Sequence, residues 1–471
     1  MHCLAWRIVA LLRIRPTVLT NTYSKRQELT TRSRTDTPPG LTSTVTAEYG
    51  YDDESRLTQA VTDTGGLLGT DTETFTLDGV GNRTAHSKIL GSWDYDANNR
   101  LTEKGLLDKT TYAYDDAGSL TQKTQGGIAT NYVYDSQHRL VEVKGTGGNP
   151  IARYGYDPMG RRIWKEAYRN QDGAPLAQAL RSYYLYSDEG LIAESQQPIT
   201  PPLPVGEGWG EGVTATAPPK ITTQYGPKPD SEFTTATLFV KTKNSAGQNT
   251  IAYYHHDHLG TPIQATDKAG NIVWSAQYNV FGQAAITTPT ATFAQPTIAS
   301  DLRFPGQVYD EETGLHYNWH RYYDPGLGRY VTADPVGLAG GVNFYAYVGG
   351  NPVNLTDPTG LNPLVTRIVL GGAARVGFPN AARMAAEAVG GGVVGCILTG
   401  YCSAADDADS DEAESCPPEK RPLKTREKRN KERREKPKDP EEAERRKNDN
   451  HDKKRRSGRG GSDPSPTGED W

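Results

Sequence analysis

The chain has 471 residues, a formal net charge of −5 at pH 7, and a mean hydropathy of −0.68, which is low for a protein built round a large apolar core. With 50 glycines, 31 prolines and 26 tyrosines, the composition disfavours helix-rich folds and favours a turn-rich all-β body. The four cysteines (Cys3, Cys396, Cys402 and Cys416) are too few and too unevenly placed for a disulfide framework, but they leave room for one local bridge among the last three. The lack of C-x2-C spacing disfavours a zinc site.

The N-terminal segment, residues 1–43, shows no convincing hydrophobic period and is rich in Thr, Arg and Pro, so we expect it to be poorly ordered. Its one apolar stretch, CLAWRIVALL, is broken by Arg7 and is followed by RIRPT without a small-residue cleavage motif. We therefore find no clear signal peptide. A chain that starts inside a longer ancestral protein is the simpler interpretation.

A repeat fills residues 44–195. Its frame is aromatic-x-Tyr-Asp, a few turn residues, then Arg-Leu or an equivalent, at a spacing of about twenty residues. Its clearest copies are YGYDDESRLTQ (Tyr49), FTLDGVGNRTA (Phe75), WDYDANNRLTE (Trp93), YAYDDAGSLTQ (Tyr112), YVYDSQHRLVE (Tyr132) and YGYDPMGRRIW (Tyr154). Alternate aromatics share one face of a strand, and the Asp begins a hairpin turn. Because one hairpin alone is too small to be stable, the repeat predicts neighbours stacked into a curved antiparallel sheet.

The repeat is interrupted at residues 196–235, where Pro, Gly and Thr dominate without an amphipathic period. We expect this segment to be an insertion that loops out of the sheet. A regular strand pattern resumes across residues 236–361.

Two groups of histidines lie in that last region. The run HHDH at residues 255–258 raises a metal-site hypothesis, because His256 and His258 would share one face of a strand. A turn at this point is the favoured interpretation. His316 and His320 lie in an aromatic-rich strand segment and are predicted to be packing residues.

Three Asp-Pro dipeptides begin at Asp324, Asp334 and Asp357. The last two open the pentapeptides DPVGL and DPTGL, whose order Asp-Pro-x-Gly is that of a type I turn with the carboxylate at its first corner. Two carboxylates held in this way can face one another and share a proton, the arrangement that acid proteolysis needs. On these residues alone, two purely structural turns are the favoured alternative, with Arg321 an ordinary ion-pair partner.

From Arg321 through GGVNFYAYVGGNP to DPTGL, the sequence resembles the core signature of the RHS/YD-repeat family, bacterial polymorphic-toxin proteins related to the teneurin YD shell. The element HHDHLGTP also fits that family, and the resemblance covers roughly Tyr49 to Leu361. It implies a spiralling antiparallel hairpin sheet that forms part of a shell. It also implies a core that cuts its own chain after the leucine of the final DPxGL.

For the site, the resemblance implies that Asp334 and Asp357 are an aspartyl protease pair supported by Arg321, and that the cut falls in cis between Leu361 and Asn362. In that interpretation one Asp is ionised and acts as general base on a water. The other is kept protonated by its neighbour's charge and donates to the Leu361 carbonyl. The resemblance implies no cofactor and no metal.

Beyond Leu361 the composition changes. Residues 362–416 are rich in Ala and Gly and then acidic, and residues 417–471 form a basic charged tail, so we expect this region to be partly helical or disordered. Charged residues interrupt the apolar run between Leu364 and Tyr401, and a linker or packed helix is favoured over a membrane span. The tail has the charge to contact nucleic acid but no nuclease constellation, and a solvated charged tail is the favoured interpretation.

The resulting expectation is a shell protein that encapsulates or presents a variable, toxin-like C-terminal region and cuts itself after Leu361. The expected partners are a cognate immunity protein, a component of a secretion apparatus and, through the basic tail, nucleic acid. The expected location is secreted or cell-surface associated, with the export route left open. Two alternatives stand beside it: a non-catalytic surface or adhesion repeat protein, and an inactive fragment left by rearrangement of a longer gene.

Overall fold

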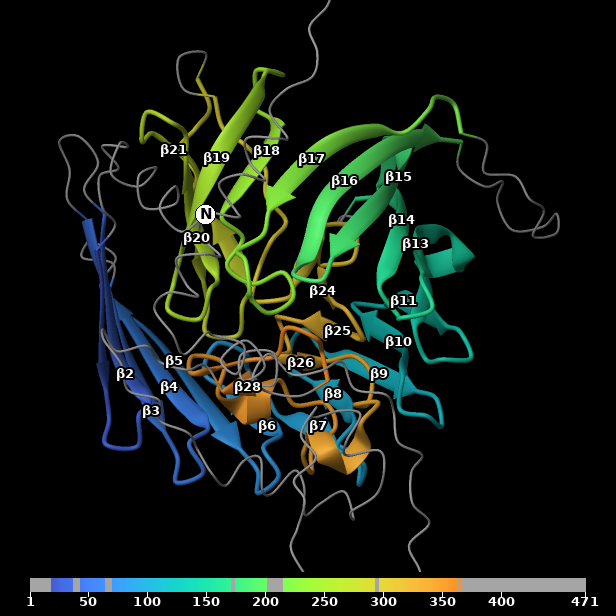
Figure 1. The fold of residues 1–471 in the computed structure, drawn as a ribbon. Helices are drawn as coiled ribbons and strands as arrows, with labels where there is room; N and C mark the ends of the chain where they lie inside the picture. The colour runs from blue at the N-terminus through green and yellow to red at the C-terminus, as the bar shows by residue number, and fades with distance from the viewer. Residues whose placement is uncertain are drawn as a thin grey trace, which may run out of the picture. The chain divides into compact units, whose positions relative to one another are not determined.

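A computed structural model describes residues 18–36, 43–63, 70–170, 174–200, 215–292, 296–361 and 364–365, all within one unit of the chain, Met1–Gly400. Nearly all regular structure in these residues is antiparallel β-sheet, as Figure 1 shows. The predicted all-β class is confirmed for this part of the chain. The expectations for residues 366–471, including the basic tail, lie outside the described residues.

The described strands form two large sheets in which sequence neighbours pair throughout. The first sheet contains β1 (Val18–Tyr23), β2 (Leu29–Asp36), β3 (Ser43–Tyr51), β4 (Leu57–Asp63), β5 (Thr70–Leu77) and β6 (Arg83–His86). The second contains β7 (Trp93–Tyr95), β8 (Leu101–Lys104), β9 (Thr110–Tyr114), β10 (Leu120–Gln125), β11 (Ile128–Tyr134), β12 (Leu140–Lys144), β13 (Pro150–Tyr156), β14 (Arg162–Arg169), β15 (Pro175–Ser187), β16 (Gly190–Ile199), β17 (Lys220–Gly226), β18 (Phe239–Lys243), β19 (Asn249–His256), β20 (Pro262–Thr266), β21 (Ile272–Tyr278) and β22 (Ala284–Ile286).

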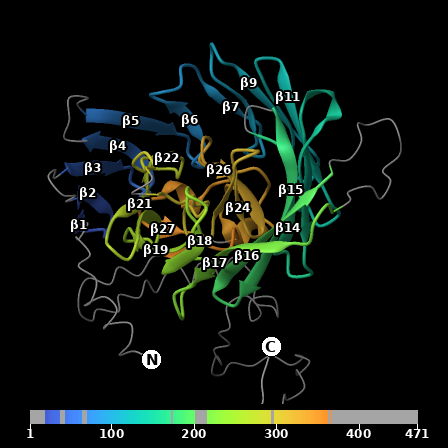
Figure 2. The ribbon, with the colours of Figure 1, turned by 90° about the horizontal axis from the view of Figure 1, so that it is seen from above.

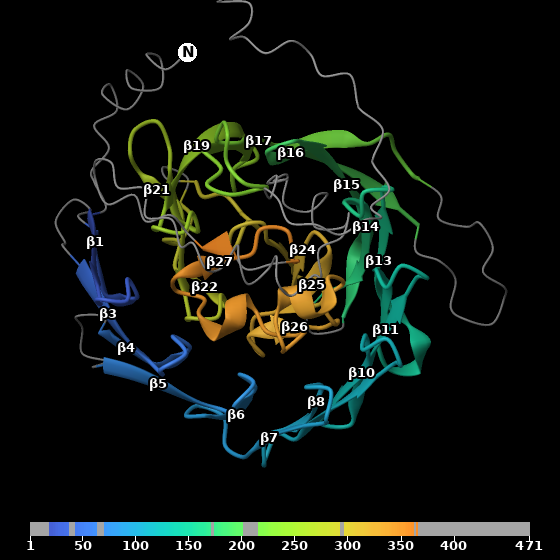
Figure 3. The ribbon, with the colours of Figure 1, turned by 60° about the horizontal axis from the view of Figure 1, so that its bottom comes forward.

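A small third sheet follows these two. It contains β23 (Val308–Asp310), β24 (Leu315–Asn318), β25 (Arg321–Asp324) and β26 (Arg329–Tyr330), and the pair β27 (Leu355–Thr356) and β28 (Leu364–Val365) comes after it. Short 3-10 turns cover Thr146–Gly148, Gly337–Gly340 and Val348–Gly350. Figures 2 and 3 show β1 to β22 curving around this late segment, so the large sheets form a wall and β23 to β27 lie inside it.

In the repeat turns that carry both Asp and Arg, the Asp holds the turn and the Arg ties it to the next hairpin. In the turn after β11, Asp135 Oδ1 accepts a hydrogen bond from the backbone N–H of Arg139 (3.0 Å), and Arg139 Nε donates to Asp135 Oδ2 (2.8 Å). Arg139 Nη1 also donates to the carbonyl of Asp157, the equivalent Asp of the next hairpin (3.2 Å). Arg56 and Arg100 make the same pair of bonds. The motif therefore encodes the turn and also the link between neighbouring hairpins.

The wall curves because its register slips beside these turns. The pairing shifts between Val133 and Tyr134 in β11, and again between Gly155 and Tyr156 in β13, just before the Asp in each case. A bulge of this kind bends the strand and increases its right-handed twist. Repeated in hairpin after hairpin, the bulge turns a flat ribbon into a wall that surrounds β23 to β26.

The inner face of the wall carries the first aromatic of each repeat frame. Trp93, Tyr112, Tyr132 and Tyr154 are at most 7 % exposed and belong to one apolar cluster. That cluster includes residues of β24 and β25 such as Tyr322. Burial of aromatic area against this inner sheet stabilises hairpins that would not be stable alone.

Within the segment 1–43, expected to be poorly ordered, the structure corrects the expectation for residues 18–36, because β1 and β2 form a hairpin there; residues 1–17 and 37–42 lie outside the described residues. This hairpin is a repeat unit in which Ser24 replaces the turn Asp and Glu28 replaces the Arg. Ser24 Oγ accepts from the backbone N–H of Arg26 and of Glu28, as the Asp does elsewhere, and also donates to the Glu28 carboxylate. Leu29 then takes the place of the usual leucine and is fully buried.

The interruption between hairpins is also narrower than residues 196–235. Strand β16 runs to Ile199, and β17 pairs with both β16 and β18, so the wall is continuous across the segment. Only residues 201–214 within it lie outside the described residues. The Thr-rich sequence of β17 supplies β-branched residues that suit a strand even without strict alternation.

The HHDH run forms the predicted turn. Asp257 Oδ1 accepts from the backbone N–H of Leu259 and of Thr261, each at 2.9 Å. His258 Nδ1 accepts from Arg32 Nη2 at 2.8 Å and its Nε2 donates to a backbone carbonyl, so this histidine ties the turn before β20 to strand β2. Across the described ranges no group of three or more His, Cys, Asp or Glu side chains could hold a metal ion. Across the same residues no helix is long and apolar enough to cross a membrane.

Candidate active site

Asp357 is held at the end of β27 by the turn that it begins. Its Oδ1 accepts hydrogen bonds from the backbone N–H of Gly360 (2.9 Å) and of Leu361 (3.1 Å). Gly360 has φ +72°, and a Cβ there would lie 2.4 Å from the backbone oxygen of Asn318. Only glycine combines this backbone angle with so close an approach. The turn therefore presses the chain just before the predicted cut against the end of β24.

Asp334 is held by a second turn, shortly after β26. Its backbone oxygen accepts from the N–H of Gly337 at 3.0 Å, as in a type I turn, and its Oδ1 accepts from the N–H of Val336 at 3.0 Å. The carboxylate lies directly over Gly340, where an added Cβ would come within 2.2 Å of Oδ2. Both Asp-Pro-x-Gly segments thus form the predicted turns and fix one carboxylate each.

Arg321, the first residue of β25, brings the two carboxylates together. Its Nη2 lies 2.9 Å from Asp334 Oδ2 and 3.5 Å from Asp357 Oδ2, so the sum of these distances bounds the separation of the two oxygens. All three residues are at most 7 % exposed. The Arg321 guanidinium thus bridges the two carboxylates. A proton shared directly between the carboxylates stays a prediction.

Arg321 also fixes the backbone that leads to the predicted cut. Its Nε donates to the carbonyl of Gly360 at 2.5 Å, and its Nη1 donates to the carbonyl of Phe344 at 3.0 Å. Together with the bond from the Leu361 N–H to Asp357, the first contact holds both sides of the Gly360–Leu361 peptide. The peptide immediately upstream of the predicted cut is therefore immobilised, while Asn362 lies outside the described residues.

The environment of Asp334 favours its neutral form. Burial raises the pKa of Asp334 to about 6, although the Arg321 guanidinium and the Val336 amide oppose that shift. The nearby Asp357 carboxylate adds to the rise because two like charges at short range disfavour each other. Near neutral pH this carboxyl can hold a proton, as a general acid must.

Three polar residues at the site were not predicted to be functional. Tyr330 donates its hydroxyl to Asp357 Oδ2 (2.7 Å), and Asn318 donates to the Tyr330 hydroxyl (2.8 Å) and to the backbone carbonyl of Asp357 (2.9 Å). His320, expected only to pack, also hydrogen-bonds through Nδ1 to the Thr359 carbonyl (3.0 Å) and so braces the turn. No sequence motif marks Tyr330 or Asn318, because both reach Asp357 only through the pairing of β24, β25 and β26.

His316 behaves as the predicted packing residue. It is 1 % exposed, its ring lies against Tyr309 and Tyr323, and its Nδ1 is paired with the Gln307 side chain at 2.7 Å. Burial lowers the pKa of His316 to about 3, so the ring is neutral at physiological pH.

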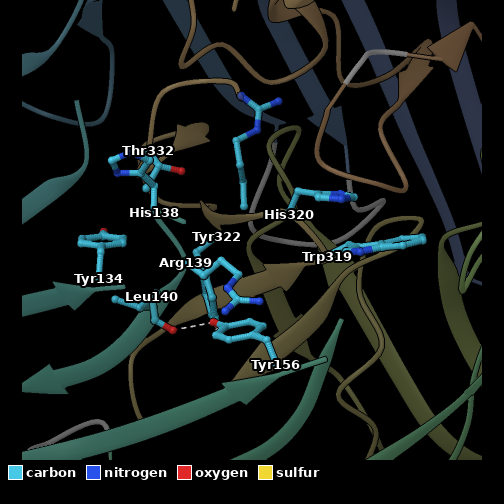
Figure 4. A pocket seen from close by; sticks show the side chains of 10 residues that line it. Tyr134, His138, Arg139, Leu140, Tyr156, Trp319, His320, Tyr322 and Thr332 are labelled. Carbon is cyan, nitrogen blue, oxygen red and sulfur yellow. Dashed lines mark hydrogen bonds between the residues drawn. The ribbon is translucent and has the colours of Figure 1, made fainter. Parts of the chain in front are cut away.

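A small cavity lies beside Arg321, between the wall and the inner sheet. Its free volume is about 10 Å³, roughly the space of one water molecule. Figure 4 shows Tyr156, His320, Tyr322 and Thr332 around it. The wall contributes residues of β11, β12, β13 and the β11–β12 turn to the lining, and the segment from Trp319 to Thr332 contributes the others.

Two protein-family models match the chain. The model described as Teneurin YD-shell matches residues 20–176, and the model described as RHS protein matches residues 251–287. The chain belongs to the RHS/YD-repeat family. The first match begins within β1, in agreement with the altered repeat unit that β1 and β2 form.

Similar proteins of the RHS/YD-repeat family include polymorphic toxins. Double-stranded DNA deaminase toxin A of Burkholderia cenocepacia is 33 % identical over 61 % of this chain and 19 % of its own length. Toxin protein Tse5 of Pseudomonas aeruginosa is 31 % identical over 55 % of this chain and 19 % of its own length. The chain therefore spans about a fifth of the length of these relatives. The solved Photorhabdus luminescens Tc holotoxin pore covers 76 % of this chain and 19 % of its own at 18 % identity, with a TM-score of 0.37.

Proposed function

We propose that this RHS/YD-repeat protein presents the region beyond Leu361 and frees it by one self-cleavage between Leu361 and Asn362. The observation that carries the proposal is the convergence of Asp334 and Asp357 on one guanidinium, which also binds the Gly360 carbonyl. Two buried carboxylates beside an immobilised segment of backbone are what aspartyl proteolysis requires.

In the proposed reaction, the ionised aspartate takes a proton from a water molecule, and the water oxygen bonds to the carbonyl carbon of Leu361. The protonated aspartate gives its proton to the carbonyl oxygen, which forms a tetrahedral diol. The diol then collapses: one of its hydroxyls returns a proton to the aspartate that acted as acid, the bond to the Asn362 nitrogen breaks, and that nitrogen takes the proton held by the aspartate that acted as base. The products are a carboxyl group on Leu361 and a free amine on Asn362. Because the bond lies in the same chain, its effective concentration at the site is very high.

The freed region would be the variable, toxin-like part of the protein. The names of the Burkholderia and Pseudomonas relatives support an effector role for residues 362–471, with an immunity protein as partner and delivery through a secretion apparatus to the cell surface or beyond. Nucleic acid is the proposed target class, supported by the DNA deaminase relative and by the basic tail. Bacteria that express the full chain should grow more slowly than bacteria that express a chain ended at Leu361. Equal growth would contradict the effector role.

The cleavage itself is tested by the intact mass of the expressed full chain. We expect a fragment that ends at Leu361 and a second that begins at Asn362, with both fragments absent in the variant Asp357→Asn and strongly reduced in Asp334→Asn. Asp324→Asn is the matched control, because Asp324 opens the first of the three Asp-Pro turns, is buried, and caps the N–H groups of two following residues without contacting Arg321. A control variant that also fails to cut would point to a general loss of folding.

A non-catalytic surface repeat protein is the second candidate function. It is favoured by the same guanidinium, because an arginine that pairs with two buried carboxylates is also a structural cross-link. In that case the wild-type chain keeps its full mass at every pH. The variants of Asp334 and Asp357 then lower only the stability.

A further inference from the structure

The hydroxyl group of Tyr330 has a defined direction. The backbone oxygen of Asp357 can only accept, so the Asn318 atom 2.9 Å away is its NH2 group. That same NH2 group lies 2.8 Å from the Tyr330 oxygen and must donate to it. The Tyr330 hydroxyl is thereby left to donate its own hydrogen to Asp357 Oδ2, at 2.7 Å.

Tyr330 itself is rigidly held. It is 1 % exposed and packs in the aromatic cluster with Phe304, Tyr323 and Tyr347. The guanidinium of Arg321 lies over its ring at 3.6 Å from the centroid. A phenol packed between this guanidinium and the rings of Tyr323 and Tyr347 keeps its hydroxyl at one place, so the bond to Asp357 is built into the fold.

The two carboxylates consequently receive unequal numbers of hydrogen bonds. Asp357 accepts from the Tyr330 hydroxyl and from two backbone N–H groups, and the guanidinium lies 3.5 Å away. Asp334 accepts from one backbone N–H and from the guanidinium. A carboxylate that accepts several hydrogen bonds is favoured in its ionised form, and its charge disfavours ionisation of a close neighbour.

We propose that Tyr330 is a positioning residue that keeps Asp357 ionised as the general base of self-cleavage and thereby leaves Asp334 as the protonated acid. The inference rests on the proposed self-cleavage and assigns the two roles within it. Tyr330 acts only through Asp357 and touches no reacting atom. The titratable or charged groups that face Asp357 are Arg321 and His320 from β25 and the turn before it, Tyr330 from β26, and Asp334 and Tyr347 from the segment that follows.

The test is the pH profile of self-cleavage in Tyr330→Phe. The full chain is isolated in urea, diluted into buffers from pH 3 to 9, and followed by intact mass, with tyrosine and tryptophan fluorescence as the record of folding. Loss of a hydrogen bond to a charged group should move the acidic limb of the profile up by about one to two pH units. The control is Tyr323→Phe, which also loses one buried tyrosine hydrogen bond (2.7 Å to the Phe281 carbonyl) in the same cluster but none to a carboxylate.

An unchanged acidic limb in Tyr330→Phe, or an equal shift in Tyr323→Phe, would overturn the inference. A wild-type chain that never cuts would instead overturn the proposed function, so the two failures are distinct. If Tyr330→Phe does not fold, the assignment of acid and base is tested by comparing the residual cleavage of Asp334→Asn with that of Asp357→Asn. The amide of Asp334→Asn can still donate a hydrogen bond, so slow residual cleavage is expected there and none in Asp357→Asn. The opposite order would refute the assignment.

Discussion

Replacing Asp310 by Asn tests whether a buried ion-pair cluster holds the inner sheet against the wall. Asp310 in β23 lies 2.5 Å from Arg162 Nη1 and 2.9 Å from Lys165 Nζ, both in wall strand β14, and the side chains of Asp310 and Arg162 are fully buried. Burial alone would raise the pKa of Asp310, but the two cations outweigh burial and hold that pKa below its usual value. Asp310 is therefore charged at neutral pH. The neutral amide of Asp310→Asn leaves buried Arg162 without a carboxylate partner and leaves Lys165 paired with Glu312 alone (3.1 Å).

Breaking a buried pair by removing one partner costs about 3–5 kcal/mol. With a urea m-value of about 3 kcal/mol/M, the unfolding midpoint of Asp310→Asn should fall by about 1–1.7 M. Asp157→Asn is the matched control, because Asp157 pairs with Arg161 at 2.8 Å but near the surface, where an ion pair contributes about 0–1 kcal/mol.

Fluorescence-monitored urea unfolding measures both variants against the wild-type chain. Because the folded-state pKa of Asp310 is depressed, its contribution is fully present above the unfolded pKa and is lost as pH falls through the folded value. The difference between Asp310→Asn and the wild type should therefore shrink in strong acid. A midpoint for Asp310→Asn no lower than that of Asp157→Asn at pH 7 would refute the reasoning.

Three further predictions concern the site and the wall. Gly340→Ala should slow self-cleavage by about 100-fold, because the added Cβ displaces the Asp334 carboxylate, while its far-UV circular dichroism spectrum stays unchanged. The control Gly79→Ala has open space around the added Cβ and should cut at the wild-type rate. Arg139→Ala should lower the free energy of unfolding by about 1–2 kcal/mol, measured in urea, since it loses the ion pair to Asp135 and the link to the next hairpin; a value near zero would contradict the linking role. Self-cleavage should slow as pH rises through about 6, where Asp334 loses its proton, and a rate still rising at pH 8 would contradict its role as acid.

The repeat architecture follows from the sequence wherever the turn carries Asp and the return strand begins with Arg-Leu. These residues act within a few positions of each other, and Asp135 with Arg139 is an example whose bonds match the expectation. The first hairpin was missed because Ser24 and Glu28 make an equivalent turn with different side chains. The repeat pattern is defined by Asp in the turn and Arg at the start of the return strand, so it misses a hairpin in which Ser24 and Glu28 make equivalent hydrogen bonds.

The site was predicted in part. The two Asp-Pro turns and Arg321 were predicted from local turn chemistry and the family resemblance, and the structure brings their side chains together. Tyr330 and Asn318 could not be predicted, since nothing in their local sequence separates them from other strand residues. Their roles depend on which residues β24 and β26 place opposite the final turn.

The sequence by itself determined the hairpins, their aromatic inner face and the direction of each turn carboxylate, because these depend on contacts between near neighbours. Only the tertiary structure decided that Arg321 lies between Asp334 and Asp357. The position of Arg321 between the two carboxylates depends on how the wall curves and on where the inner sheet packs against it. Contacts such as Arg162 with Asp310, which are 148 residues apart, set that seating.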